Sequence, residues 1–204
     1  MTIVTLTGPT CAGKSSVEAR LQYMGFGRVV SHTTRAPRAG EINGEAYHFV
    51  SDEEYCALKN AGKFIETTEF GSSKYAITDD ALNLACAGGN DVVIVVEPNG
   101  AEQVHDFCDK VSLPSIAVWV DCSVVTQARR WIGRLMTDIV SGKSVADPYA
   151  ERLALMLVEE AQWRRLQNFG YIKEHSERTY HLSLDSETGQ PQELARAVVD
   201  YLHH

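Results

Sequence analysis

The chain has 204 residues, of which 44% are hydrophobic and 23% charged, and its formal net charge is −8. This length suits one globular domain, and the composition argues against a wholly disordered chain. The acidic balance argues against a protein that coats nucleic acid or an anionic membrane surface.

Short apolar runs alternate with helical segments along most of the chain. The runs that predict strands are Met1–Thr7, Arg28–Ser31, Asp91–Val96, Ser115–Val120 and Tyr180–Leu184. The segments that predict helices are Lys14–Met24, 99–110, 123–135, 149–169 and 190–202. Because strands alternating with helices form parallel sheets covered on both faces, the pattern predicts a three-layer α/β fold with a parallel central sheet.

Two regions break this alternation. Residues 32–88 carry three short strand-like pieces, and a helix in this region begins at Ser51 with Glu54 completing a capping box. The pieces are Tyr47–Val50, Phe64–Thr68 and Lys74–Ile77. Short strands joined by tight loops predict a small mixed-sheet insertion. The stretch Leu135–Pro148, which contains Gly142, predicts a mobile loop between two helices.

A phosphate-binding motif follows the first predicted strand. Gly8 to Ser15 fits the pattern G-x-x-x-x-G-K-[ST] without exception. Its glycines let backbone N–H groups turn toward phosphate oxygens, and the next helix presents its positive end to the same anion. Lys14 can reach the β- and γ-phosphates, while the Ser15 hydroxyl can ligate Mg²⁺. The residues expected to bind the phosphates of ATP are Gly8, Pro9, Thr10, Cys11, Ala12, Gly13, Lys14, Ser15 and Ser16.

A second candidate for the metal site is Glu97, which follows the buried run Asp91–Val96. An acid in that position can hold Mg²⁺ through water, or it can simply be a carboxylate at the end of a strand. The chain has no N-K-x-D motif, so a GTPase is not favoured.

A second anion site is suggested by the stretch 19–40, which has four arginines and no acid. Arg35 and Arg38 are three residues apart with a proline between them, so they offer two guanidinium forks to one phosphate. Spacing alone leaves open whether these arginines bind a ligand or are solvated surface charges.

The run SHTTRAPRAGEINGEAYHFVSDEEY resembles the monophosphate-binding segment of guanylate kinases. The phosphate-binding loop, the stretch Phe64-Ile65-Glu66 and the later Tyr75 are similar to that family too, and the likeness extends more weakly to Arg152. The resemblance covers most of the chain. It implies one domain over 1–204, with a core (1–31, 89–133 and 149–204), a monophosphate-binding subdomain (32–88) and a lid (134–148).

The resemblance also implies an activity and its residues. A kinase of this family would use ATP and Mg²⁺ to convert GMP or dGMP into the diphosphate. The implied catalytic residues are Lys14, Arg130, Arg134 and Arg152. The implied monophosphate-binding residues are Ser31, Arg35, Arg38, Tyr47, Glu66, Tyr75 and Ile77. A carboxylate at Glu66 can accept hydrogen bonds from the N1–H and 2-amino groups of guanine, which adenine cannot match.

Three positions depart from the family pattern. Ile77 stands where the family has a hydroxyl side chain, Val95 stands where it has an aspartate, and Leu135 replaces a glycine. The changes at Ile77 and Val95 fit either drift within the family or an altered base or sugar preference. The alternatives are therefore a kinase of the same fold for another or modified nucleoside monophosphate, and a catalytically silent protein-binding module.

The sequence also gives expectations about the cell compartment and the oligomeric state of the protein. No apolar run approaches the roughly 20 residues that cross a bilayer, and Met1–Thr7 lacks the basic region of a signal peptide. Five scattered cysteines form no C-x-x-C pair. We therefore expect a cytoplasmic monomer or homodimer with reduced thiols, which binds neither membrane nor nucleic acid.

Overall fold

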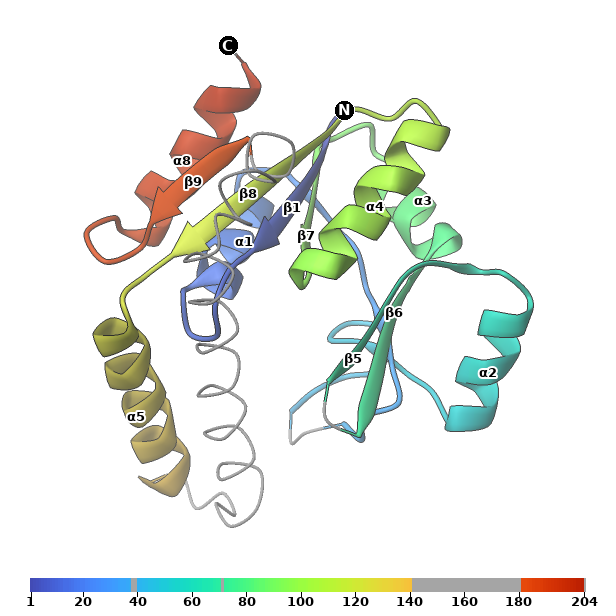
Figure 1. Cartoon of the computed structure of the whole chain (residues 1–204), viewed down its shortest axis with the longest axis horizontal. Helices are drawn as coiled ribbons and strands as arrows, with labels where there is room; N and C mark the ends of the chain where they lie inside the picture. The colour runs from blue at the N-terminus through green and yellow to red at the C-terminus, as the bar shows by residue number, and fades with distance from the viewer. Residues whose placement is uncertain (38–39, 71, 141–180, 204) are drawn as a thin grey trace, which may run out of the picture. The chain divides into compact units, whose positions relative to one another are not determined.

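The computed structural model describes residues 1–37, 40–70, 72–140 and 181–203 (Figure 1). The chain divides into two compact units. The first comprises Met1–Thr7 and Glu18–Ala117, and the second comprises Gly8–Val17 and Val118–His204.

Three parallel strands form the centre of the first unit. β7 (Val92–Val95) lies between β1 (Ile3–Thr7) and β2 (Gly27–Arg28), with Ile3 and Gly27 both in register with Val92. The side chains of β1 are all buried, which explains its uninterrupted run of apolar and threonine residues. Helix α4 (Pro98–Lys110) packs against β1, and α3 (Asp79–Cys86) packs against β2.

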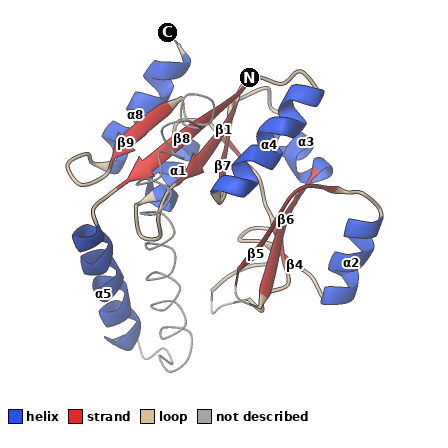
Figure 2. Cartoon of the chain, in the orientation of Figure 1, coloured by secondary structure: helices blue, strands red, loops and turns tan. Residues whose placement is uncertain are grey.

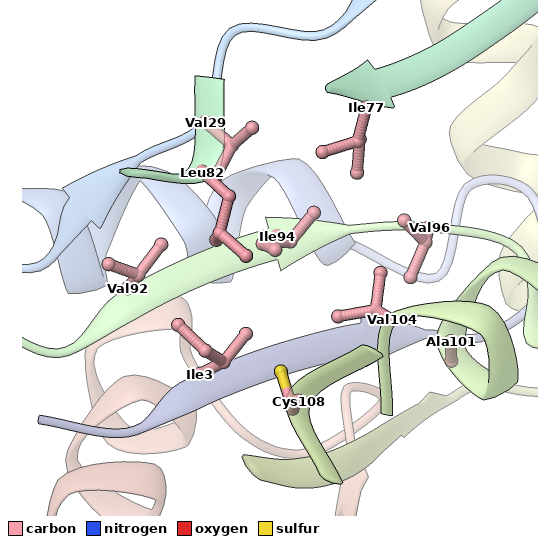
Figure 3. Close-up of a cluster of buried hydrophobic side chains, with 10 residues drawn as sticks. All are labelled: Ile3, Val29, Ile77, Leu82, Val92, Ile94, Val96, Ala101, Val104 and Cys108. Carbon is pink, nitrogen blue, oxygen red and sulfur yellow. The ribbon is translucent and has the colours of Figure 1, made fainter. Parts of the chain in front are cut away.

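The core of this unit gathers aliphatic side chains from these elements (Figure 3). Its buried members are Ile3, Val29, Ile77, Leu82, Val92, Ile94, Val96, Ala101, Val104 and Cys108. Each buried aliphatic side chain stabilises the fold by roughly 1.5–3 kcal/mol relative to exposure. Burial also raises the pKa of the Cys108 thiol to about 11, so this cysteine is a packing residue.

A separate mixed sheet occupies the middle of the sequence, in the order β4-β3-β6-β5. Its strands are β3 (His32–Thr33), β4 (His48–Phe49), β5 (Phe64–Phe70) and β6 (Ser73–Thr78). β3 and β4 are parallel, while β6 is antiparallel to both β3 and β5. Helix α2 (Asp52–Asn60) begins with the predicted capping box of Ser51 and Glu54.

The outer strand β5 is partly covered by a side chain of α4. Gln103 accepts a hydrogen bond from the Thr67 N–H at 3.0 Å and donates one to the Thr67 carbonyl at 3.2 Å. A carboxamide therefore takes the place of a neighbouring strand at this point of the edge.

The second unit contains the phosphate-binding loop and the first turns of α1 (Lys14–Tyr23). β8 (Ser115–Asp121) runs parallel to β9 (Leu182–Asp185), and α8 (Pro191–Leu202) packs against β9 (Figure 2). Helix α5 (Val124–Val140) follows β8.

These elements confirm the predicted α/β class with a parallel central sheet and a mixed-sheet insertion. The predicted loop is wrong for Leu135–Val140, because α5 continues to Val140. Leu135 and Met136 favour helix, and no glycine or proline occurs between Leu135 and Gly142. The rest of that loop and the predicted helix 149–169 lie outside the described residues.

Smaller differences occur in the insertion. The predicted strand Arg28–Ser31 is too long, since β2 ends at Arg28 and the chain then leaves β7 to pair as β3. Helix α3 was not predicted, although Thr78 caps it through the Ala81 N–H at 3.1 Å. The predicted subdomain and lid boundaries stay predictions. Of the helices in the described ranges, none combines the length and apolar character that crossing a bilayer demands.

Candidate functional site

The loop Gly8–Gly13 has the backbone shape that an anion-binding turn requires. Gly8 and Gly13 have φ values of +143° and +102°, and Cys11 between them has φ +62°. A Cβ on Gly8 would lie 2.1 Å from the Val120 carbonyl oxygen, so a larger residue cannot replace it without moving backbone. The invariant part of the motif therefore has a steric cause in this chain.

Lys14 begins α1 at the end of this loop. Its ammonium donates hydrogen bonds to the Gly8 carbonyl at 2.5 Å and the Pro9 carbonyl at 3.1 Å. Both acceptors belong to the loop itself, so the charge of Lys14 sits over the turn that the motif assigns to phosphates.

Arg130 of α5 binds the outside of the same loop. Its guanidinium donates to the carbonyls of Cys11 and Ala12, at 3.2 and 3.1 Å. It also donates to the carbonyl and hydroxyl of Ser186, at 2.5 and 3.0 Å. The buried Ser186 in turn donates to the Asp121 carbonyl at 2.8 Å, which links β8, β9 and the loop.

A cavity of about 450 Å³ opens beside these groups in the second unit. It is lined by Thr10, Cys11, Ala12, Gly13, Lys14, Ser15, Ser16, Val17, Arg130, Arg134, Ser186, Gly189, Pro191 and Leu194. The lining combines three cationic side chains, Lys14, Arg130 and Arg134, with a few apolar ones, which suits a nucleotide with its phosphates at the loop. Two of the predicted catalytic arginines, Arg130 and Arg134, are thus brought to the loop.

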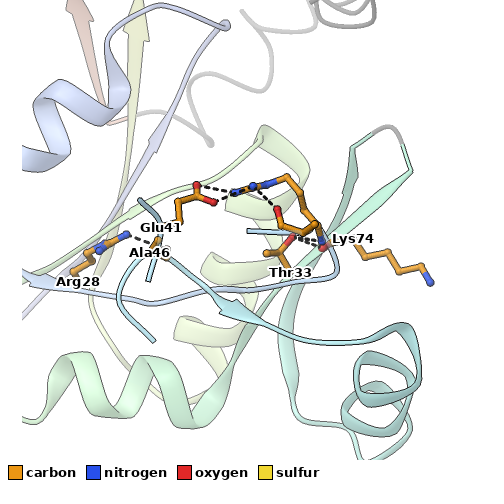
Figure 4. Close-up of polar contacts among 7 residues, drawn as sticks. Arg28, Thr33, Glu41, Ala46 and Lys74 are labelled. Carbon is orange, nitrogen blue, oxygen red and sulfur yellow. Dashed lines mark hydrogen bonds and ion pairs between the residues drawn. The ribbon is translucent and has the colours of Figure 1, made fainter. Parts of the chain in front are cut away.

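In the first unit, Arg35 forms a bidentate ion pair with Glu41, at 3.0 and 2.9 Å (Figure 4). The guanidinium carbon lies 5.4 Å from the Tyr47 ring centroid and 5.7 Å from that of Phe49. The ion pair and the two ring contacts hold the fork in one orientation.

The backbone around Arg35 is anchored by β3 and β6. Thr33 donates through its hydroxyl to the Lys74 carbonyl at 3.0 Å, and the Arg35 N–H donates to that hydroxyl at 3.2 Å (Figure 4). Arg28 ties the segment before Tyr47 to β2 by donating to the carbonyls of Glu45 and Ala46, at 2.7 and 3.2 Å. These bonds place Arg35 and Tyr47 in one cluster.

Tyr47 and Tyr75, both predicted to hold a monophosphate, have ring centroids 5.9 Å apart. Burial and the neighbouring Tyr75 raise the pKa of Tyr47 above its ordinary value. Tyr47 therefore keeps its phenolic proton at neutral pH and can donate it to an anion.

Glu66 lies buried on β5 with 4% of its surface exposed. Its Oε1 accepts a hydrogen bond from the Thr68 hydroxyl at 2.5 Å. Burial raises the pKa of Glu66, the Thr68 hydrogen bond opposes this rise, and the charge of Glu97 adds to it. A Cβ on Gly100 would lie 2.7 Å from Oε1, so the first turn of α4 packs directly on this carboxylate.

The remaining predicted site residues differ in how far their side chains are buried, and two of them are not described by the structure. Ile77 is 1% exposed and belongs to the hydrophobic core, and its role in binding a monophosphate stays a prediction. Ser31 and Glu97 are half-buried, and Ser15 is exposed at the cavity. Two further predicted residues, Arg38 and Arg152, lie outside the described residues.

Four residues of these sites were missed by sequence reasoning: Glu41, Thr68, Gly100 and Ser186. Glu41 belongs to the quoted motif, yet no spacing rule predicts its pairing with Arg35, from which it is 6 positions away. Ser186 meets Arg130 across 56 positions, so only the fold brings them together.

Comparisons with known proteins agree on one family. A family model described as guanylate kinase matches residues 1–146. The guanylate kinase of Bifidobacterium longum is 33% identical over 163 residues, covering 78% of this chain and 80% of that protein. The guanylate kinase of Cupriavidus metallidurans is 38% identical over 102 residues, covering 49% of this chain and 47% of that protein.

A solved structure shows the same fold. The crystal structure of guanylate kinase from Anaplasma phagocytophilum aligns with a TM-score of 0.62 and 20% sequence identity. The alignment covers 99% of this chain and 84% of that chain. At this identity the likeness concerns the fold alone.

Proposed function

This chain belongs to the guanylate kinase family of nucleoside monophosphate kinases, and from that premise we propose that it phosphorylates GMP or dGMP. It transfers the γ-phosphoryl of ATP to the monophosphate and yields ADP with GDP or dGDP. The observation that carries the proposal is the phosphate-binding loop, where Lys14 lies over the carbonyls of Gly8 and Pro9.

The donor nucleotide binds in the cavity beside the loop. Backbone N–H groups at the start of α1 and the ammonium of Lys14 hold its phosphates, and Arg130 and Arg134 face the same cavity. The exposed hydroxyl of Ser15 fits a Mg²⁺ ligand, since hydroxyl oxygens are hard donors, and Glu97 would act through water. When bound, Mg²⁺ supplies charge neutralisation for the phosphates.

The acceptor monophosphate binds at the cluster of Arg35, Tyr47 and Tyr75. A guanidinium fork and a protonated phenol donate hydrogen bonds to phosphate oxygens, which aims the attacking oxygen. The carboxylate of Glu66 reads the base. Arg38 and Arg152 join the acceptor and catalytic groups in this proposal on the strength of the family motif.

A second candidate is a kinase of the same fold that prefers another or modified nucleoside monophosphate. The observation that favours it is the burial of Ile77 in the core, where the family pattern has a hydroxyl that helps to read the base. Val95, where that pattern has an aspartate, points the same way. Loss of polar base contacts changes discrimination between bases more than it changes catalysis.

The test is a coupled assay with the purified chain, ATP and a panel of ribo- and deoxynucleoside monophosphates, including modified bases. We expect turnover with GMP or dGMP, and a fall of at least about 10³-fold in Lys14→Ala. A preferred substrate other than a guanine nucleotide would favour the second candidate. Absence of both turnover and ATP binding would favour a silent protein-binding module.

The proposal also covers the cell compartment and the oligomeric state of the protein. We place the reaction in the cytoplasm, in a monomer or homodimer without nucleic-acid or membrane partners. Fractionation and light scattering test these points independently of activity.

A further inference from the structure

The buried carboxylate of Glu66 is held by a neighbour two residues along the same strand. Side chains two positions apart on a strand share one face, so Thr68 lies beside Glu66 by the pleat alone. The Thr68 hydroxyl donates a hydrogen bond to Oε1 of Glu66 across 2.5 Å.

A second contact restrains the same oxygen from the other direction. Gly100 lies in the first turn of α4 and leaves no room for a Cβ, which would meet Oε1 at 2.7 Å and both Cδ and Cγ at 3.2 Å. The first turn of a helix also favours a negative charge. In the described part of the chain, no residue hydrogen-bonds to Oε2.

We propose that Thr68 is a positioning residue for base recognition, which together with Gly100 fixes the Glu66 carboxylate with Oε1 bound internally and Oε2 directed to the base. This inference rests on the proposed function, in which Glu66 reads guanine. It assigns a specificity role to a residue outside the family motif quoted above.

The physical reason lies in what burial does to an unsupported carboxylate. Burial alone favours the neutral acid, which has a reduced capacity to accept hydrogen bonds from two adjacent donors. A hydroxyl donor stabilises the ionised form, and a single fixed rotamer lowers the entropy lost when the base binds. Thr68 thus affects the affinity for guanine rather than the groups proposed to act on the transferred phosphoryl.

The alternative is that Thr68 has only a structural role, as a residue with a high β-strand propensity. Threonine is favoured in strands because it is β-branched, and valine shares that property. Thr68→Val therefore removes the hydroxyl while keeping shape and strand preference, and Thr68→Ser restores the hydroxyl. Thr67→Val is the matched control, because only the backbone of Thr67 takes part in the contacts with Gln103.

The experiment compares steady-state constants of these variants with GMP and with inosine monophosphate, which lacks the 2-amino group. Thr68→Val should raise the KM for GMP about tenfold and leave kcat and the KM for ATP within about twofold. The preference for GMP over inosine monophosphate should fall by a similar factor. Thr68→Ser should recover most of the affinity, and Thr67→Val should resemble the unmodified chain.

Gly100→Ala provides an independent test, because it displaces Oε1 without touching the hydroxyl. We expect the same rise in KM with kcat retained, and this variant decides the matter if Thr68→Val fails to fold. An active Thr68→Val enzyme with unchanged KM and unchanged base preference would overturn the role of Thr68 and leave the proposed function standing. A wild-type chain that ignores every guanine nucleotide would overturn both.

Discussion

Two arginines, one in each unit, face the proposed nucleotide sites, and their partners differ in kind. Arg130 donates to the backbone carbonyls of Cys11, Ala12 and Ser186 and to the Ser186 hydroxyl. Arg35 instead forms a bidentate pair with the carboxylate of Glu41. The first arginine is held by neutral dipoles and the second by an opposite charge.

The difference has a consequence for binding. A cation held by neutral dipoles keeps its net charge for an incoming phosphate. A cation paired with a carboxylate is already neutralised, so a phosphate must share or displace the acid. We infer that Arg130 in the donor site can bind a phosphate without giving up an anionic partner. In the acceptor site, the phosphate must replace the Glu41 carboxylate as the partner of Arg35.

Among the variants that test this contrast between the two arginines, the largest effect is expected at Arg130. Arg130→Gln removes the charge that faces the cavity, and kcat should fall about 10²–10³-fold because charge on the transferring group loses a stabilising partner. The measurement is the coupled assay at saturating substrates. Arg129→Gln, at the exposed neighbouring position, is the control. A loss confined to stability, with kcat intact, would make Arg130 a brace of the loop only.

An intermediate effect is expected at Glu66, the buried acid of the mixed sheet. Because the fold raises the pKa of Glu66, ionisation of this carboxyl lowers the stability of the folded state. The loss of stability is complete at pH values above the folded-state pKa and is absent below the ordinary value near 4.5. Glu66→Gln should therefore raise Tm by a few degrees at neutral pH. That gain should shrink as the pH falls.

The same substitution should weaken GMP about tenfold, because a carboxamide offers one acceptor and one donor where guanine presents two donors. Thermal melts over a pH series and GMP titrations provide the two readouts. Glu69→Gln, at an exposed acid of the same strand, controls for general charge effects. A lower Tm for Glu66→Gln at neutral pH would contradict the direction assigned to the pKa.

The smallest effect concerns the carboxylate that holds Arg35. Glu41→Gln should lower Tm slightly, since a half-buried pair of this kind contributes about 1 kcal/mol. It should also tighten GMP about threefold, because the phosphate no longer competes with an acid. Calorimetric titration measures this change, with Glu45→Gln as the exposed control. Weaker binding would mean that Glu41 orients Arg35 for the phosphate, and the contrast between the units would then disappear.

The sequence predicted correctly those elements that are determined by residues close together in the chain. The strands Asp91–Val96 and Ser115–Val120, the capping box at Ser51 and the phosphate-binding loop each follow from a periodicity or a motif within a few residues. The predicted helix 123–135 was too short, because no spacing rule marked the continuation of α5 to Val140. The position of a helix terminus depends on tertiary packing as much as on propensity.

Local sequence patterns could not predict which residues contact the functional side chains. Ser186 meets Arg130, and Gly100 meets Glu66, only because strands and helices distant in sequence are brought together. The case of Ile77 is different. Its place in the family motif suggested a binding residue, while its aliphatic side chain is satisfied by the core.

The carboxamide of Gln103 has a meaning for how the protein behaves in solution. β5 ends the mixed sheet, and an open edge is a template on which another chain can add a strand. By binding both backbone groups of Thr67, Gln103 removes one rung from that template. A Gln103→Ala variant should therefore aggregate more than the parent chain during refolding, as light scattering would measure, while its catalytic constants stay unchanged.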